Sequence, residues 1–251
     1  MRDALGADAR ALLPLAASHR ATFLIEDPAT VWNLGAERYT EIARRYSRLT
    51  PKPGRLAVDL NIVERYQDVY PTKQQAGTEL FRLVRRASLA FRRVALYSEN
   101  SIAAADVGWL SSAAAGVESW SRQGRGLTIE SRFGTGIRWT GPALVDGRLW
   151  PAADEDTVWL PPGRHRVEPA RLEPPVRLAD LTGELISAEA LGDGMVIAYR
   201  SEGRALALVD RRPARVALDG KPLDNAVPAT GARHLIRLPE GRHELRVEVK
   251  G

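Results

Sequence analysis

The stretch Arg55-Leu-Ala-Val-Asp-Leu-Asn-Ile-Val63 decides the fold of the first part of the chain. Its nearly unbroken apolar run is typical of a strand that is buried on both faces of a parallel sheet. Similar runs stand at 21–26 and 94–99, and apolar residues at helical spacing separate the three. We therefore expect parallel strands joined by right-handed crossovers, which is an α/β arrangement.

The same alternation predicts helices and one more strand around these three. Apolar spacing indicates helices over 28–45, 72–92 and 103–115, and Thr72 with Gln75 has the spacing of a capping box. A fourth parallel strand is predicted at 116–120. Residues 1–122 would thus form one domain of about four βα units. Charged residues interrupt the apolar ones in 1–20, which indicates an amphipathic helix and not a signal peptide.

Residues 123–251 have a different pattern, with short strand-like runs at 8–12-residue spacing. This spacing predicts an antiparallel β-sandwich domain. A hairpin is expected between 127–132 and 137–140, around a turn that contains Gly134 and Gly136.

The sandwich region contains an internal repeat. Asp146-Gly147 leads to Pro-Gly-Arg-His165, and Asp219-Gly220 leads to Glu-Gly-Arg-His243. Asp-Gly is a hairpin-turn dipeptide, so two similar hairpin units are expected over 144–168 and 215–248. The two histidines hold equivalent places after a turn, which explains them as strand residues and not as metal ligands. No zinc-protease motif or Cys-based metal site accompanies them.

Composition narrows the function classes. The 251 residues are 44% hydrophobic, as in an ordinary globular protein, and no apolar window approaches the roughly 18 residues of a membrane-spanning helix. The chain has no Cys, which excludes disulfides and thiol nucleophiles. The net charge of +5 comes mainly from scattered Arg, and this scatter argues against nucleic-acid binding. No phosphate-binding or nucleophile-elbow motif is present, so no cofactor is expected.

Polar side chains gather where the predicted parallel strands end. Glu26, Asn61 with Glu64, Glu99 and Trp120 each stand where an apolar run gives way to polar chain. Carboxyl ends of parallel strands lie on one side of the sheet, and ligands bind there. These residues are therefore the candidates for a functional site, although capping of the following helices would also explain polar strand ends.

The layout resembles two known groups of proteins. The repeat resembles small β-modules, including the PEGA type, that are attached to extracytoplasmic bacterial proteins. The stretch 194–210, continued by 216–220, is similar to the C-terminal β-sandwich of bacterial glycosidases. The first part resembles the last βα units of a TIM barrel in clan A glycoside hydrolases. This resemblance implies a periplasmic or secreted parent protein that acts on an oligo- or polysaccharide.

The resemblance implies roles for individual residues. If the four strands are the fifth to eighth of a barrel, Glu99 stands where retaining clan A enzymes carry their nucleophile, and Trp120 where they keep an aromatic platform. Glu64, Glu26 and Asp59 are the candidates for the second carboxyl, and no sequence feature selects one of the three. The residues expected to contact sugar are Asn61, Tyr66, Tyr97, Asn100, Trp120 and Trp32.

The chain departs from the family in one respect, since four βα units cannot close a barrel of about eight strands. The strand that carries the family's acid/base has no counterpart. The chain is then a fragment, or a second copy or another subunit completes the sheet, or the sheet is open. Two other functions therefore stay open: a non-catalytic carbohydrate-binding or envelope assembly protein, and an open-sheet α/β enzyme of unrelated chemistry.

Overall fold

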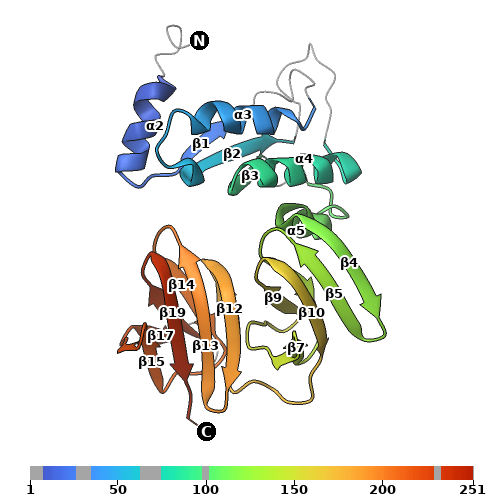
Figure 1. Cartoon of the computed structure of the whole chain (residues 1–251), viewed down its shortest axis with the longest axis vertical. Coiled ribbons are helices and arrows are strands. Elements are labelled where there is room, and N and C mark those ends of the chain that lie inside the picture. Colours follow the sequence, from blue (N-terminus) through green and yellow to red (C-terminus); the bar gives the residue numbers. More distant parts are fainter. Residues whose placement is uncertain (1–7, 27–34, 63–74, 98–101, 229–232, 251) are drawn as a thin grey trace. The chain divides into compact units, whose positions relative to one another are not determined.

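A computed structural model describes residues 8–26, 35–62, 75–97, 102–228 and 233–250. The chain divides into two compact units, Met1–Gly116 and Val117–Gly251 (Figure 1). The first unit is α/β and the second consists of antiparallel sheets, so the expected combination of α/β and β parts is confirmed.

The first unit contains a three-stranded parallel sheet in the order β1-β2-β3. Its strands are β1 (Phe23–Glu26), β2 (Leu56–Asn61) and β3 (Arg93–Tyr97). Its helices are α2 (Ala9–Ser18), α3 (Arg38–Ser47), the short 3-10 helix η2 (Pro53–Arg55), α4 (Gly77–Ala90) and α5 (Val107–Ala115). Both strand pairs are parallel, as the alternation of strands and helices predicts.

One face of this sheet packs against helices. The side chains on that face are Phe23, Ile25, Leu56, Val58, Leu60, Val94 and Leu96, and they share one apolar core with residues of α2, α3, α4 and α5. Tyr39 and Leu80 are among the fully buried members of this core. The prediction that β2 is buried on both faces holds for most of the strand, because Ala57 and Asn61 on the other face are also buried and only Asp59 is half-buried.

Helix α4 begins without the capping box predicted from Thr72 and Gln75. Its N-cap is Ala76, and Thr72 lies outside the described residues. The backbone N–H of Gly77 instead donates to a carboxylate oxygen of Asp106 at 2.8 Å. Asp106 is buried and precedes α5, so one carboxylate satisfies the first turn of α4 and ties α4 to α5.

The predicted fourth parallel strand is wrong. Residues 117–123 form β4 (Val117–Gln123), which pairs antiparallel with β5 (Gly126–Ser131) in the second unit. The physical reason is the Gly124-Arg125 turn, which reverses the chain within two residues and allows only an antiparallel neighbour. The parallel sheet therefore has three strands among the described residues.

The second unit begins with a first β-module, Val117–Pro169. Its main sheet has the order β4-β5-β10-β7-β8, and β6 pairs with β9 in a second, smaller sheet. The remaining strands are β6 (Thr135–Arg138), β7 (Ala143–Val145), β8 (Arg148–Leu149), β9 (Thr157–Leu160) and β10 (Gly163–Pro169). The predicted hairpin between 127–132 and 137–140 is therefore wrong, because β5 and β6 belong to different sheets.

A second β-module, Glu184–Glu248, repeats this plan with the order β12-β13-β19-β15-β16. Its facing sheet has the order β11-β14-β18-β17, where β11 precedes the module. The strands are β11 (Leu178–Leu181), β12 (Glu184–Leu191), β13 (Gly194–Ser201), β14 (Ala205–Val209), β15 (Arg215–Leu218), β16 (Lys221–Pro222), β17 (Ala226–Pro228), β18 (His234–Leu238) and β19 (Gly241–Glu248). Buried side chains of both facing sheets, among them Ile197, Leu245, Ala207 and Ile236, belong to one core.

Candidate functional site

The parallel sheet has a second face, on which polar side chains gather at the carboxyl ends of the strands. Glu26 of β1 is in register with Asp59 of β2, and Asn61 of β2 is in register with Tyr97 of β3. Because side chains alternate along a strand, these four point away from the helix-packed face. None of them belongs to the apolar core of the unit.

These four side chains differ in exposure. Asn61 is 5% exposed, whereas Tyr97 is 54% exposed and Glu26 is also exposed. Asp59 is half-buried between them. A buried amide beside a half-buried carboxylate offers a fixed hydrogen-bonding surface, and the Tyr97 ring next to it offers an apolar face with a hydroxyl.

Nearer the amino ends of the strands, this face carries Leu24, Ala57 and Arg93. The guanidinium of Arg93 donates to the hydroxyl of Thr22 at 2.9 Å. Ala57, which lies between Leu24 and Arg93 in register, is 5% exposed, whereas Leu24 is 53% exposed. The polar side chains gather at the carboxyl ends of the strands, where ligands bind in parallel sheets.

The geometry of Glu26 and Asp59 allows two-carboxylate chemistry. Neighbouring strands lie about 4.8 Å apart, so two carboxyls in register can stand near the separation of about 5–5.5 Å that retaining glycoside hydrolysis needs. They can also accept hydrogen bonds from several hydroxyls of one sugar. Sequence reasoning named both residues, together with Glu64, as candidates for the second carboxyl.

The other predicted site residues divide into two groups. Most lie outside the described residues: Glu99, Glu64, Tyr66, Asn100 and Trp32. Trp120 is described and is 68% exposed, but it stands on the antiparallel strand β4 of the other unit. The expectation that Trp120 ends a fourth parallel strand beside Glu99 is therefore wrong, since convergence at a common sheet edge holds only for strands of one parallel sheet.

The two β-modules share a clamp formed by an aspartate and a histidine. Asp146 lies 2.8 Å from Nδ1 of His165 and accepts the Arg166 N–H at 2.8 Å. Asp219 lies 2.7 Å from Nδ1 of His243 and accepts the Glu244 N–H at 2.9 Å. The two histidines thus have equivalent backbone settings, as the repeat predicts, although the clamp itself was not predicted.

The clamp depends on the Asp-Gly turn. Asp146 and Asp219 have φ values of 53° and 51°, and the glycines that follow them also have positive φ. This is the turn that joins β7 to β8 and β15 to β16, and it places the aspartate side chain against the His near the start of β10 or β19.

Hydrogen bonding shifts the pKa of both aspartates. Burial raises the pKa of Asp146, but hydrogen bonds from the Arg166 N–H and His165 outweigh it, so the pKa lies below its usual value. The Glu244 N–H and then His243 lower the pKa of Asp219. Both carboxylates therefore stay ionised as clamps.

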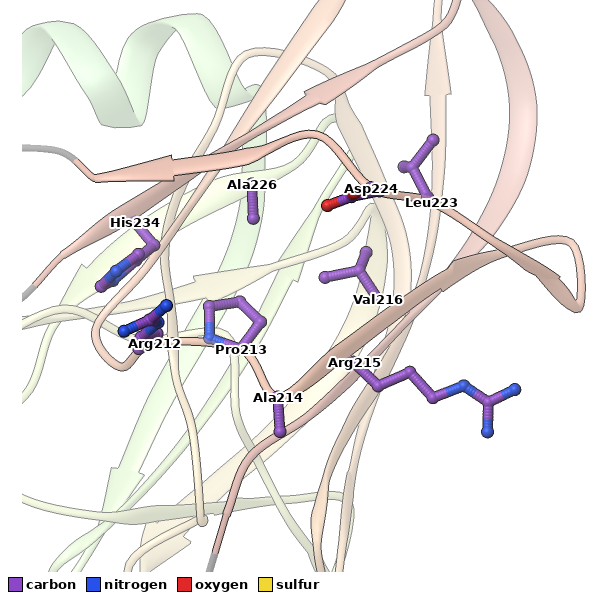
Figure 2. Close-up of a pocket in the computed structure, with 9 residues that line it drawn as sticks. All are labelled: Arg212, Pro213, Ala214, Arg215, Val216, Leu223, Asp224, Ala226 and His234. Carbon is purple, nitrogen blue, oxygen red and sulfur yellow. The ribbon is translucent and has the colours of Figure 1, made fainter.

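The modules differ at one end, where the second contains a pocket of about 320 Å³. Arg212, Asp224 and His234 contribute its polar groups, and Pro213 and Leu223 are among its apolar walls (Figure 2). Sequence reasoning missed this pocket. Aligning the repeats would have given the signal, because the residue at the place of Leu223 in the first module is the buried Trp150.

Among the described residues, no group of three or more His, Asp or Glu side chains could hold a metal ion. The described helices also include none that is long and apolar enough to cross a membrane.

Comparison of the chain with models of known protein families gives no match, and comparison with curated proteins gives none either.

Proposed function

We propose that the chain is a carbohydrate-active protein of the glycoside hydrolase type, with its sugar site on the face of the parallel sheet opposite the apolar core of the first unit. The observation that carries this proposal is the set of polar side chains at the strand ends. Glu26, Asp59, Asn61 and Tyr97 lie on one face and on three neighbouring strands. A sugar needs such a set of carboxylates, amides and a ring within a few ångströms.

In this proposal two carboxyls divide the chemistry. Glu99 follows Tyr97 by two residues along the chain and acts as the nucleophile, as the resemblance to retaining glycosidases implies. A second carboxyl protonates the leaving oxygen, and Asp59, Glu26 and Glu64 are the candidates. Asp59 is favoured because it is half-buried and stands in register with Glu26 on the neighbouring strand.

Neutral amide variants test these roles. We expect Glu99→Gln and Asp59→Asn each to lower kcat/KM for an aryl glycoside by about 100-fold or more. The matched control is Glu41→Gln on α3, whose carboxylate binds Arg44 and Arg45 on the helix surface. Azide should restore turnover in the nucleophile variant and not in the control. Turnover of both site variants within a few-fold of the unmutated chain would contradict the proposal.

A second candidate function rests on a different observation. The two β-modules have the same strand order and the same Asp–His clamp, which is the arrangement of a tandem binding protein. On this hypothesis the chain binds carbohydrate, or assembles with envelope components, without hydrolysing anything. Binding of a polysaccharide to the full chain without release of reducing ends, unchanged by Glu99→Gln, would favour this candidate over the hydrolase.

A further inference from the structure

The pocket of the second β-module lies between the segment 212–216, the segment 223–226 and the start of β18. Its volume of about 320 Å³ is at the small end of ligand pockets, which begin near about 300 Å³. A single sugar residue or a ligand of similar size is therefore the largest occupant that it can enclose.

Opposite charges line the pocket. Figure 2 shows the guanidinium of Arg212 close to the His234 ring at one end, while Asp224 lies towards the other end. Within the described part of the chain, the Arg212 guanidinium and the Asp224 carboxylate make no hydrogen bond or ion pair. An unpaired guanidinium prefers a carboxylate as a bidentate partner, and an unpaired carboxylate accepts hydroxyl donors.

Small apolar side chains stand between these charges. Figure 2 shows Pro213, Ala226 and Val216 between Arg212 and Asp224, and Leu223 lines the pocket beyond Asp224. Such a surface can cover the C–H face of a pyranose ring, whereas it would leave a fully hydrated ion without contacts. The ligand should therefore have an anionic end, a compact apolar face and hydroxyls at the opposite end.

The first β-module holds a buried ring at the place of Leu223. Trp150 N–H donates to Ala143 at 2.9 Å, and Leu223 N–H donates to Val216 at 2.9 Å, so the two residues are equivalent. Trp150 is 7% exposed and belongs to the core. The module thus accepts a ring system at this position, and the smaller Leu223 leaves space for one that comes from outside.

We propose that this pocket binds an acidic sugar residue, a hexuronate, with its carboxylate on Arg212 and its hydroxyls on Asp224. The choice of a sugar over another small hydroxy acid rests on the proposed function, but the pocket itself does not depend on the parallel sheet. The site would hold an acidic polysaccharide at its second β-module.

Titration of the full chain with galacturonic acid and glucuronic acid, followed by NMR or calorimetry at neutral pH, tests this proposal. We expect binding of at least one of the two, and binding of galactose, glucose and acetate at least about tenfold weaker. If acetate binds with the same affinity as the uronates, the pocket recognises only an anion. If galactose binds with the same affinity, the carboxylate does not contribute to binding. Either result overturns the proposal.

Variants locate the binding. Arg212→Gln should weaken uronate binding by about tenfold or more, while Arg211→Gln, one residue outside the pocket lining, should not. Leu223→Trp should fill the pocket as Trp150 fills its counterpart, and should abolish binding while circular dichroism stays unchanged. If that variant does not fold, Asp224→Asn gives the second measurement. Uronate binding that survives both Arg212→Gln and Asp224→Asn would overturn the proposal.

The outcome is separable from the proposed hydrolase function. Loss of turnover in Glu99→Gln with uronate binding intact would support both proposals. Uronate binding without any turnover by the unmutated chain would contradict the hydrolase and leave the pocket proposal in place. Turnover of neutral aryl glycosides without uronate binding would support the hydrolase and contradict the pocket proposal.

Discussion

The first and second β-modules have the same five-stranded order, the same turn and the same clamp, but they differ in how one end is closed. In the first module Trp150 and the partly buried Trp139 pack into the core. In the second module the place of Trp150 holds Leu223, which with Arg212 lines a pocket. The comparison teaches that turn and clamp residues fix the strand plan, whereas the side chain at this one place differs between a buried ring and a residue that lines a pocket.

The largest effect that this comparison predicts concerns Trp150. Its indole is 7% exposed and its Nε1–H donates to the carbonyl of Trp159 at 2.8 Å. Trp150→Ala should therefore lower the free energy of unfolding by about 3–5 kcal/mol. Leu223→Ala at the equivalent place is expected to cost about 1 kcal/mol, because the side chain already borders a pocket. Guanidinium unfolding of the two variants measures both values, and equal losses would break the comparison.

A second effect concerns the first residue of a central strand in each module. A Cβ on Gly194 would overlap the carbonyl oxygen of Val247 on β19, so Gly194→Ala should cost about 3 kcal/mol. A Cβ on Gly126 would have its nearest neighbour at 3.4 Å, which is ordinary contact. Gly126→Ala should change stability by about 1 kcal/mol or less. Urea denaturation of the two variants measures both losses of stability. A loss of about 1 kcal/mol or less in Gly194→Ala would mean that β13 and β19 are less closely paired.

Local patterns predicted the parts of the fold that depend on local spacing. The apolar run that contains Val58 and Leu60 identified a buried parallel strand, and the Asp-Gly and Gly-Arg-His spacings identified equivalent turns. The sequence did not predict correctly which strands pair, because pairing joins residues that are far apart in the chain. Thus β4 was assigned to the parallel sheet, and β5 was paired with β6, although it pairs with β4 and β10.

The candidate site, like the fold, was predicted where it depends on local sequence and not where it depends on contacts between distant segments. Asn61 was predicted at a strand end and Tyr97 as a residue that contacts sugar, and their register places them side by side. The association of Trp120 with them failed because it followed from the wrong strand assignment. The pocket near Arg212 could not be read from any local motif, since its walls come from three segments and its existence depends on a missing ring.

The smallest effect concerns the histidine of each clamp and its response to pH. Nδ1 of His243 lies 2.7 Å from Asp219, and its Nε2 lies 2.9 Å from the carbonyl oxygen of Glu240. Both nitrogens face acceptors, so the protonated ring can donate a hydrogen bond to each of them, whereas the neutral ring can donate only one. The Asp219 carboxylate and then the Glu240 carbonyl raise the pKa of His243. The neighbouring Tyr199 stays neutral, because burial and then Asp219 raise its pKa to about 12.

The sign of the pH dependence follows from these shifts. A raised pKa in the folded state means that the stabilisation by His243 is complete below its unfolded pKa of about 6.5 and is lost as pH rises through the folded pKa. The lowered pKa of Asp219 has the opposite effect, since its stabilisation is present above about 3.9 and is lost as pH falls through the folded value. The clamp of the second module should thus be strongest between about pH 4 and pH 6.5.

Unfolding midpoints measured between pH 5 and pH 8 test this expectation with one variant in each module. His243→Asn should flatten the decline in stability towards pH 8, because it removes the group whose proton is lost. His165→Asn is the matched control, since Nε2 of His165 is buried without a hydrogen-bond partner and the ring has only Asp146 to hold it. The clamp is partly exposed to solvent, so the expected change is small. The deciding quantity is the difference between the two variants in the slope of the unfolding midpoint against pH. Equal slopes would show that the Glu240 carbonyl contributes nothing and that the two clamps are interchangeable.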